Sequence, residues 1–188
     1  INVKGHGVIV VSLTDEMRIE AVKLASLIRN KAREKGLQER VKGNIRKELI
    51  GALGQFAFAS YIAGNWKEAL KYVNIGGPDQ CDIILDGYVI DVKTRSKASY
   101  DYLLVPKVQF QSRKYNFYVG QQLRGEEIWI WGFATKDEVP RAPLKDFGNR
   151  GVPSYYIPLR KLHPINELAK LTQSSKSKGL LDQFVTER

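Results

Sequence analysis

Two aspartates near the middle of the chain, Asp82 and Asp91, have the spacing to share one cation. The residues around them predict two short strands, 82–85 and 88–93, joined by the turn Asp86-Gly87. A two-residue turn places Asp82 opposite Asp91, and opposed residues of a hairpin have Cβ atoms about 4.5–5.5 Å apart. Two carboxylates at this distance repel each other unless a positive group lies between them. The spacing therefore predicts a divalent cation held by oxygen ligands.

The alternation of side chains along this hairpin predicts one apolar face and one polar face. The face that must join the core carries Ile83, Leu85, Tyr88, Ile90 and Val92. The opposite face carries both aspartates and Lys93, together with Ile84 and Val89. Lys93 would place a positive donor beside the two carboxylates. For Asp91 and Lys93 the alternative is an ordinary surface ion pair.

A helix predicted before the hairpin, from about 44 to 63, carries two further candidate ligands. Small residues such as Gly54 would let this helix lie close to a sheet. Glu48 and Gln55 share one stripe of the helix, so either side chain could reach the aspartates. Glu48 could instead pair with a basic neighbour on the helix. The helix itself is predicted from apolar residues at helical spacing, Ile45, Leu49, Leu53 and Phe56.

This combination of residues resembles the PD-(D/E)XK nuclease superfamily. Asp82, the run Asp91-Val92-Lys93 and a preceding helix with an acid match the pattern of that family. The literal Pro78-Asp79 makes Asp79 a rival for the first aspartate, but hairpin pairing positions Asp82. The predicted order of a helix, three strands, a helix near 107–114 and a strand at 116–121 is also similar to the family's core, in which the three strands form a meander.

The resemblance implies a restriction-endonuclease-like fold. This is an α/β single domain, residues 1–188, in which a central mixed β-sheet is flanked by helices. We expect its core at about 44–135. An N-terminal helix at about 14–35 precedes the core, because Thr14 followed by two acids is typical of a helix start. The polar C-terminal segment, about 172–188, is expected to be flexible.

The resemblance also implies a metal site built around Mg²⁺, with Mn²⁺ as a substitute. Lys93 would hydrogen-bond the attacking water or the scissile phosphate. Relatives often carry a glutamate after a glycine on the first helix, where this chain has Gln55 after Gly54. Either Glu48 replaces that acid, or the site is attenuated. The oxygen ligands of the ion would then be Asp82, Asp91, the backbone carbonyl of Val92 and Glu48.

The activity implied by the resemblance is metal-dependent hydrolysis of phosphodiester bonds in DNA by an endonuclease. Its preference for a sequence, or for linear or branched DNA, stays open. The alternative is a DNA-binding protein that keeps the nuclease fold but cleaves weakly or not at all. Relatives that place two active sites on two strands also suggest a homodimer.

The charge balance indicates a polyanionic partner. The chain carries 30 Lys and Arg against 20 Asp and Glu, a net charge of +10. Between residues 29 and 47, here called the basic segment, eight basic residues face two acidic ones, a local net charge of +6. We expect this segment, together with Lys176 and Lys178, to provide most of the affinity for DNA. The candidate DNA contacts are Arg33, Lys35, Arg40, Lys42, Arg95, Lys97, Gln111 and Tyr115, the last two because a Gln-x-x-x-Tyr element follows the catalytic lysine in some branches of the superfamily.

Composition excludes several other classes of protein. The single cysteine, Cys81, excludes a disulfide framework and a cysteine-based zinc site. No stretch approaches the roughly 18 apolar residues that a membrane span needs. We therefore expect an intracellular, cytoplasmic protein without membrane attachment, in the host cytoplasm if the source is viral. Trp129 and Trp131 alternate on a predicted strand, where packing on a sheet face is favoured over base stacking.

Overall fold

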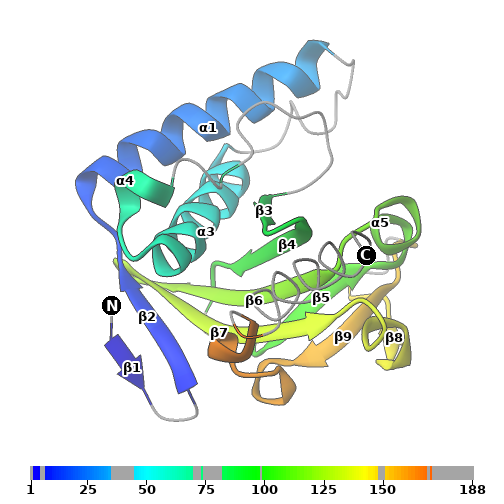
Figure 1. Cartoon of the computed structure of the whole chain (residues 1–188). Helices are drawn as coiled ribbons and strands as arrows, with labels where there is room; N and C mark the ends of the chain where they lie inside the picture. Colours follow the sequence, from blue (N-terminus) through cyan, green and yellow to red (C-terminus); the bar gives the residue numbers. More distant parts are fainter. Residues whose placement is uncertain are drawn as a thin grey trace, which may run out of the picture.

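The computed structural model describes residues 2–4, 7–34, 45–69, 73, 82–97, 99–147, 151–168 and 170. Its largest element is a six-stranded mixed sheet, the main sheet, in the order β1-β2-β7-β6-β4-β3 (Figure 1). β4 and β6 run parallel, and the other neighbours are antiparallel. The strands of the main sheet are β1 (Asn2–Lys4), β2 (Val8–Ser12), β3 (Ile83–Leu85), β4 (Tyr88–Arg95), β6 (Phe117–Arg124) and β7 (Glu127–Thr135).

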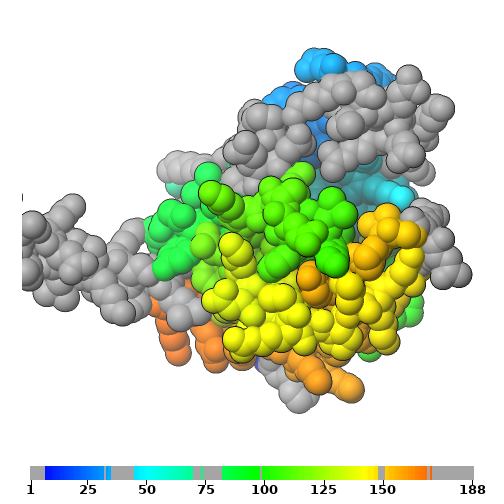
Figure 2. All heavy atoms as spheres, turned by 90° about the vertical axis from the view of Figure 1, so that its right-hand side faces the viewer, coloured from blue at the N-terminus to red at the C-terminus, as the bar shows by residue number. Residues whose placement is uncertain are grey.

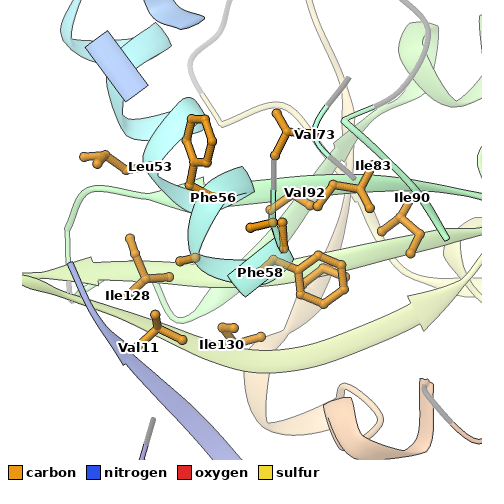
Figure 3. Packing of buried hydrophobic residues seen from close by; sticks show 14 of the residues in the cluster. Val11, Leu53, Phe56, Phe58, Val73, Ile83, Ile90, Val92, Ile128 and Ile130 are labelled. Carbon is orange, nitrogen blue, oxygen red and sulfur yellow. The ribbon is translucent and has the colours of Figure 1, made fainter. Parts of the chain in front are cut away.

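Three helices lie on one side of the main sheet: α1 (Asp15–Glu34), α3 (Arg46–Ala63) and α4 (Trp66–Ala69) (Figure 1). The main core fills the space between them and the sheet. In Figure 3, Phe56 and Phe58 of α3 pack above the strands, against a layer that includes Val92 of β4 and Ile130 of β7. The predicted α/β class, a mixed sheet flanked by helices in one domain, is confirmed.

The two long predicted helices form close to their predicted positions. α1 begins after Thr14, whose Oγ1 accepts a hydrogen bond from the N–H of Met17 at 3.3 Å. Two acids in its first turn and two bases in its last complement the helix dipole. α3 ends at Gly64, which adopts the left-handed φ of +77° that stops a helix. The Thr14 cap therefore located the start of α1, and apolar periodicity located α3.

α3 comes very close to the main sheet at Gly54. A Cβ atom at this position would lie 1.7 Å from Oγ1 of Thr94 and 2.7 Å from Oε1 of Gln121. By contrast, a Cβ at Gly51, one turn earlier, would meet nothing within 4 Å. The absence of a side chain at Gly54 therefore sets the distance between α3 and strands β4 and β6.

A second, three-stranded sheet in the order β5-β9-β8 packs against the opposite face of the main sheet. The second core joins the two sheets, with Tyr118 of β6 on one side and Leu103 of β5 on the other. Figure 2 views the molecule from the side on which α5 lies in Figure 1. The elements of this half are β5 (Tyr102–Pro106), α5 (Lys107–Ser112), β8 (Leu144–Lys145), β9 (Ser154–Pro158) and the 3₁₀ turns Val139–Arg141 and Leu159–Lys161.

The three-strand meander expected from the resemblance does not form. β5 pairs with β9, from Tyr102 opposite Pro158 to Pro106 opposite Ser154, and not with β4. β6 pairs in parallel with Ile90–Arg95 of β4, on the edge away from β3 where the third strand of a meander would lie. β5 instead buries its apolar residues in the second core.

Two further expectations concern the membrane and the C-terminal segment. Among the described residues, no helix has both the length and the apolar composition to cross a membrane. The C-terminal segment, about 172–188, lies outside the described residues.

Candidate active site

The hairpin of β3 and β4 has the predicted turn and register. Asp86 and Gly87 adopt φ angles of +48° and +83°, as a two-residue type I′ turn requires. The observed pairs are Ile83 with Ile90, Ile84 with Val89 and Leu85 with Tyr88. Asp82 directly precedes the paired residues and lies close enough to Asp91 for the charge of Asp91 to raise its pKa.

The two faces of the hairpin also separate as predicted. The predicted apolar face, from Ile83 to Val92 in alternation, lies in or against the main core. Val89 on the other face packs against the second core. Asp91 is only 2% exposed. A carboxylate so deeply buried does not form an ordinary surface ion pair with Lys93.

Asp82 extends the hairpin ladder with its side chain. Its N–H donates to the carbonyl of Ile90 at 3.3 Å, and its Oδ2 accepts from the N–H of Val92 at 2.7 Å. The N–H and C=O of one strand residue point to the same side, so the Val92 carbonyl also faces this edge of β4. The first aspartate and the backbone oxygen expected from the resemblance therefore lie on one side of the strand.

Of the two candidate ligands on α3, Gln55 contacts Asp82. Its Nε2 donates to Oδ1 of Asp82 at 2.8 Å, and the residue is buried. Glu48 lies seven residues earlier, which is about 10.5 Å along the helix axis. Its Oε2 is buried and has no hydrogen-bond partner among the described residues. The structure thus brings Gln55, and not Glu48, to the aspartates.

Lys93 bridges the hairpin and α5. Its Nζ lies 3.0 Å from Oδ1 and 2.9 Å from Oδ2 of Asp91, and it donates to Oε1 of Gln109 at 3.0 Å. Sequence reasoning missed Gln109, although it stands on the helix predicted near 107–114. Only the packing of α5 shows which residue of that helix reaches Lys93.

The charges of the site do not balance. Burial, and then the negative charge of Asp91, raise the pKa of Asp82 to about 7. Lys93 and the hydrogen bond from the Val92 N–H act in the opposite direction. Lys93 contacts both oxygens of Asp91, so while Asp82 is also ionised a single ammonium compensates two carboxylates. An additional cation would be stabilised here.

Two buried tyrosines lie near Asp91. Burial, and then the charge of Asp91, raise the pKa of the Tyr115 and Tyr118 hydroxyls above the ordinary value. Both groups therefore stay protonated at neutral pH and can donate hydrogen bonds. Tyr118 is the register partner of Asp91 on β6, and its Oη has no hydrogen-bond partner among the described residues.

The donor set fits a hard divalent cation that keeps part of its water shell. Among the described residues, no group of three or more His, Cys, Asp or Glu side chains could hold a metal. The site nevertheless offers oxygen ligands from the two carboxylates and the Val92 carbonyl. Gln55 would add its Oε1 if its amide group were rotated by 180°. Mg²⁺ commonly binds one or two carboxylates and completes its octahedron with water and substrate phosphate. Buried Oδ2 of Asp91, which has an ionic contact but no hydrogen bond, would be one such ligand.

The predicted DNA contacts fall into several groups. Arg33 is exposed in the last turn of α1, and Gln111 is exposed on α5. Arg95 is partly buried at the end of β4, and Lys97 after it is exposed. The other predicted DNA contacts of the basic segment lie outside the described residues: Lys35, Arg40 and Lys42. The same holds for Asp79, Cys81, Lys176 and Lys178.

Tyr115 differs from the expectation. It follows α5 instead of lying on it, and it is 1% exposed. Its ring packs edge-on against Tyr118 at 5.6 Å between centroids, and its Oη accepts a hydrogen bond from Nη1 of Arg113 at 2.8 Å. A ring held in the second core cannot stack on a nucleotide, so we replace its assignment as a DNA contact by a structural role beside Asp91.

Comparison of the chain with models of protein families, with curated proteins and with solved structures found no match in any of the three.

Proposed function

We propose that this chain is a metal-dependent nuclease of the PD-(D/E)XK type that hydrolyses phosphodiester bonds in DNA. The observation that carries the proposal is the meeting of Asp82, Asp91 and Lys93 at β4, where two carboxylates face one ammonium. Mg²⁺, or Mn²⁺ in its place, would be held by the two carboxylates and the Val92 carbonyl. When bound, the ion supplies charge neutralisation at the phosphate and a more acidic water.

The residues of the chain orient the reacting groups. Lys93 has three N–H donors, and its hydrogen bonds to Asp91 and Gln109 leave one for a phosphate oxygen or the attacking water. Gln55 and the N–H of Val92 fix both oxygens of Asp82. Because these partners come from α3, β4 and α5, the site depends on the packing of three elements.

The second candidate function is a DNA-binding protein with the same arrangement but weak or absent cleavage. Gln55 at the position nearest Asp82 favours it, since an amide is a poorer ligand for a hard cation than a carboxylate. A panel of labelled duplex, single-stranded and branched DNA, incubated with Mg²⁺ or with EDTA, separates the two. We expect cleavage only with the metal; binding without cleavage in Mg²⁺ and in Mn²⁺ would establish the second function. A homodimer and a cytoplasmic location stay predictions.

Gln55→Glu is expected to tighten Mg²⁺ binding about tenfold or more and to raise the cleavage rate. The substitution adds a carboxylate within hydrogen-bond distance of Asp82, where a cation would relieve the repulsion. Glu48→Gln, the matched change on the same helix stripe, should alter neither value by more than about twofold. Calorimetry of Mg²⁺ binding and cleavage rates at saturating enzyme test both variants. A strong loss of binding in Glu48→Gln would instead make Glu48 the helix ligand.

Charge reversal in the basic segment is expected to weaken DNA binding across unrelated sequences. Each phosphate that a cation neutralises releases counterions and contributes roughly −0.9 to the log–log slope of affinity against salt on duplex DNA. Changing Arg33, Lys35, Arg40 and Lys42 to Glu should therefore lower affinity and flatten this slope, as fluorescence anisotropy would show. The control reverses four exposed cations outside the segment, Lys136, Arg141, Arg160 and Lys161, for the same change in net charge. Equal losses in both variants would assign the effect to net charge alone.

A further inference from the structure

The polar face of β4 continues beyond the candidate active site to Arg95. Asp91, Lys93 and Arg95 share this face because side chains alternate along a strand, and Lys93 and Arg95 are about 6.6 Å apart along it. The Cζ of Arg95 lies 5.5 Å from the ring centroid of Tyr102 and 6.0 Å from that of Tyr100. Its Nε is buried and has no hydrogen-bond partner among the described residues. Arg95, the next cation after Lys93 on this face, therefore lies against a group of aromatic rings.

Four rings form what we call the aromatic strip: Tyr100, Tyr102, Phe147 and Tyr156. Tyr102 and Phe147 stack at 5.1 Å between centroids with an interplanar angle of 20°, and Phe147 stacks on Tyr156 at 5.5 Å and 25°. Tyr102 also lies 5.9 Å from Tyr100 and 5.0 Å from Tyr156. Phe147 is 45% exposed. Phe147 therefore exposes part of its side chain to solvent beside a stack of partly buried rings.

Cations accompany these rings. Lys97 lies 5.6 Å from the Tyr100 centroid, and Lys145 lies 5.1 Å from that of Tyr156. Within the described ranges, no carboxylate pairs with Arg95, Lys97 or Lys145. The strip therefore combines aromatic rings with cations that form no ion pair among the described residues.

A second aromatic group adjoins the strip through Gln122. The Cζ of Arg124 lies 4.1 Å from the ring of Trp129 and 5.5 Å from that of Trp131, both partly exposed on β7. Oε1 of the fully buried Gln122 accepts hydrogen bonds from Arg124 and Trp131, while its Nε2 donates to the Tyr100 carbonyl at 2.6 Å. The tryptophans thus pack on a sheet face, as the sequence predicted, and do so next to the strip.

We propose that the aromatic strip binds an unpaired stretch of the DNA strand that passes Lys93. Rings beside cations without an ion pair suit single-stranded nucleic acid, because bases stack on the rings while the cations contact the phosphates. Bases inside a duplex already stack on one another and cannot use such a surface. Two exposed acids also border the strip, Asp101 between Tyr100 and Tyr102 and Asp146 beside Phe147, where Asp146 accepts from the N–H of Gly151. The three cations Arg95, Lys97 and Lys145 outnumber them.

The substrate class that follows is DNA with a single-stranded tail, flap or branch next to the cleaved bond. This inference rests on the proposed function for the position of the cleaved bond, because the bond is placed beside Lys93. Binding of the tail does not depend on cleavage, so the two can fail separately.

The test measures binding in EDTA, where cleavage cannot occur. Fluorescence anisotropy compares a blunt duplex with the same duplex carrying a single-stranded tail, and 2-aminopurine in the tail reports stacking. We expect the wild type to bind the tailed DNA at least about tenfold more tightly and to quench the 2-aminopurine. Phe147→Ala should weaken binding of the tailed DNA roughly 5- to 100-fold, the loss expected when one base no longer stacks, and change binding of the blunt duplex less than about twofold.

Two controls accompany this comparison. Phe147→Tyr retains an aromatic face and should restore the preference for the tail, whereas Val152→Ala, at an exposed apolar residue outside the strip, should leave both affinities unchanged. Equal affinity of the wild type for blunt and tailed DNA would overturn the strip and leave the nuclease proposal standing. A preference for tailed DNA in a protein that never cleaves DNA would support the aromatic strip and overturn the nuclease proposal.

Discussion

Lys93→Met is expected to slow DNA cleavage about 10²- to 10³-fold while Mn²⁺ binding stays within about twofold. Lys93 donates from β4 toward Asp91 and Gln109 and is not a ligand, so its loss removes a donor to the reacting phosphate. Asp91→Asn should abolish both cleavage and metal binding, because it removes one of two charged ligands. Single-turnover cleavage and calorimetry separate the two effects.

These substitutions are chosen to keep the shape of the side chains, because Asp91 is buried and alanine would leave a void beside the second core. Thermal unfolding followed by circular dichroism checks that each variant folds. Lys136→Met, which removes an exposed lysine after β7, is the matched control and should cleave at the wild-type rate. Unimpaired cleavage by either Lys93→Met or Asp91→Asn would remove the nuclease assignment from this site.

Gly54→Ala is expected to lower the free energy of unfolding by about 1–3 kcal/mol or more and to remove most of the cleavage activity. A methyl group there would overlap Oγ1 of Thr94 and Oε1 of Gln121, so α3 must move away from the sheet. Such a shift would carry Gln55 out of hydrogen-bond distance of Asp82. Urea denaturation and cleavage rates measure the two consequences.

Gly51→Ala is the matched control for this change. Gly51 lies on the same helix with nothing within 4 Å of a Cβ, so alanine should stabilise the protein by about 0.5–1 kcal/mol through helix propensity. Cleavage should be unchanged. If both alanine variants were equally stable, the close approach of α3 at Gly54 would not be what positions Gln55.

The parts of the site that depend on local sequence were predictable. Asp86-Gly87 specifies a turn type, and the turn specifies the register of the pairs from Leu85–Tyr88 to Ile83–Ile90. That register brings Asp82 close to Asp91, where contacts with Gln55 and the Val92 N–H hold its carboxylate. The two faces of the hairpin follow from the same alternation. Likewise, Thr14 and Gly64 are local signals for the ends of α1 and α3.

The parts that depend on distant packing were not predictable. β5 pairs with β9, about fifty residues later in the chain, and β6 takes the edge of β4 where the third strand of a meander would lie. Helical periodicity placed Glu48 and Gln55 on one stripe, but the contact at Gly54 decides which of them reaches Asp82. The partner of Lys93 depends in the same way on where α5 packs, and so does the burial of Tyr115.

The central claim is that Asp82 and Asp91 share one divalent cation, and a crystal soaked in Mn²⁺ tests it most directly. We predict an anomalous difference peak within coordination distance of carboxylate oxygens of both aspartates, with Lys93 beside it. The peak should disappear in Asp91→Asn crystals soaked in the same way. Well-ordered aspartates without a peak between them, or a Mn²⁺ ion bound only at other residues, would contradict the account.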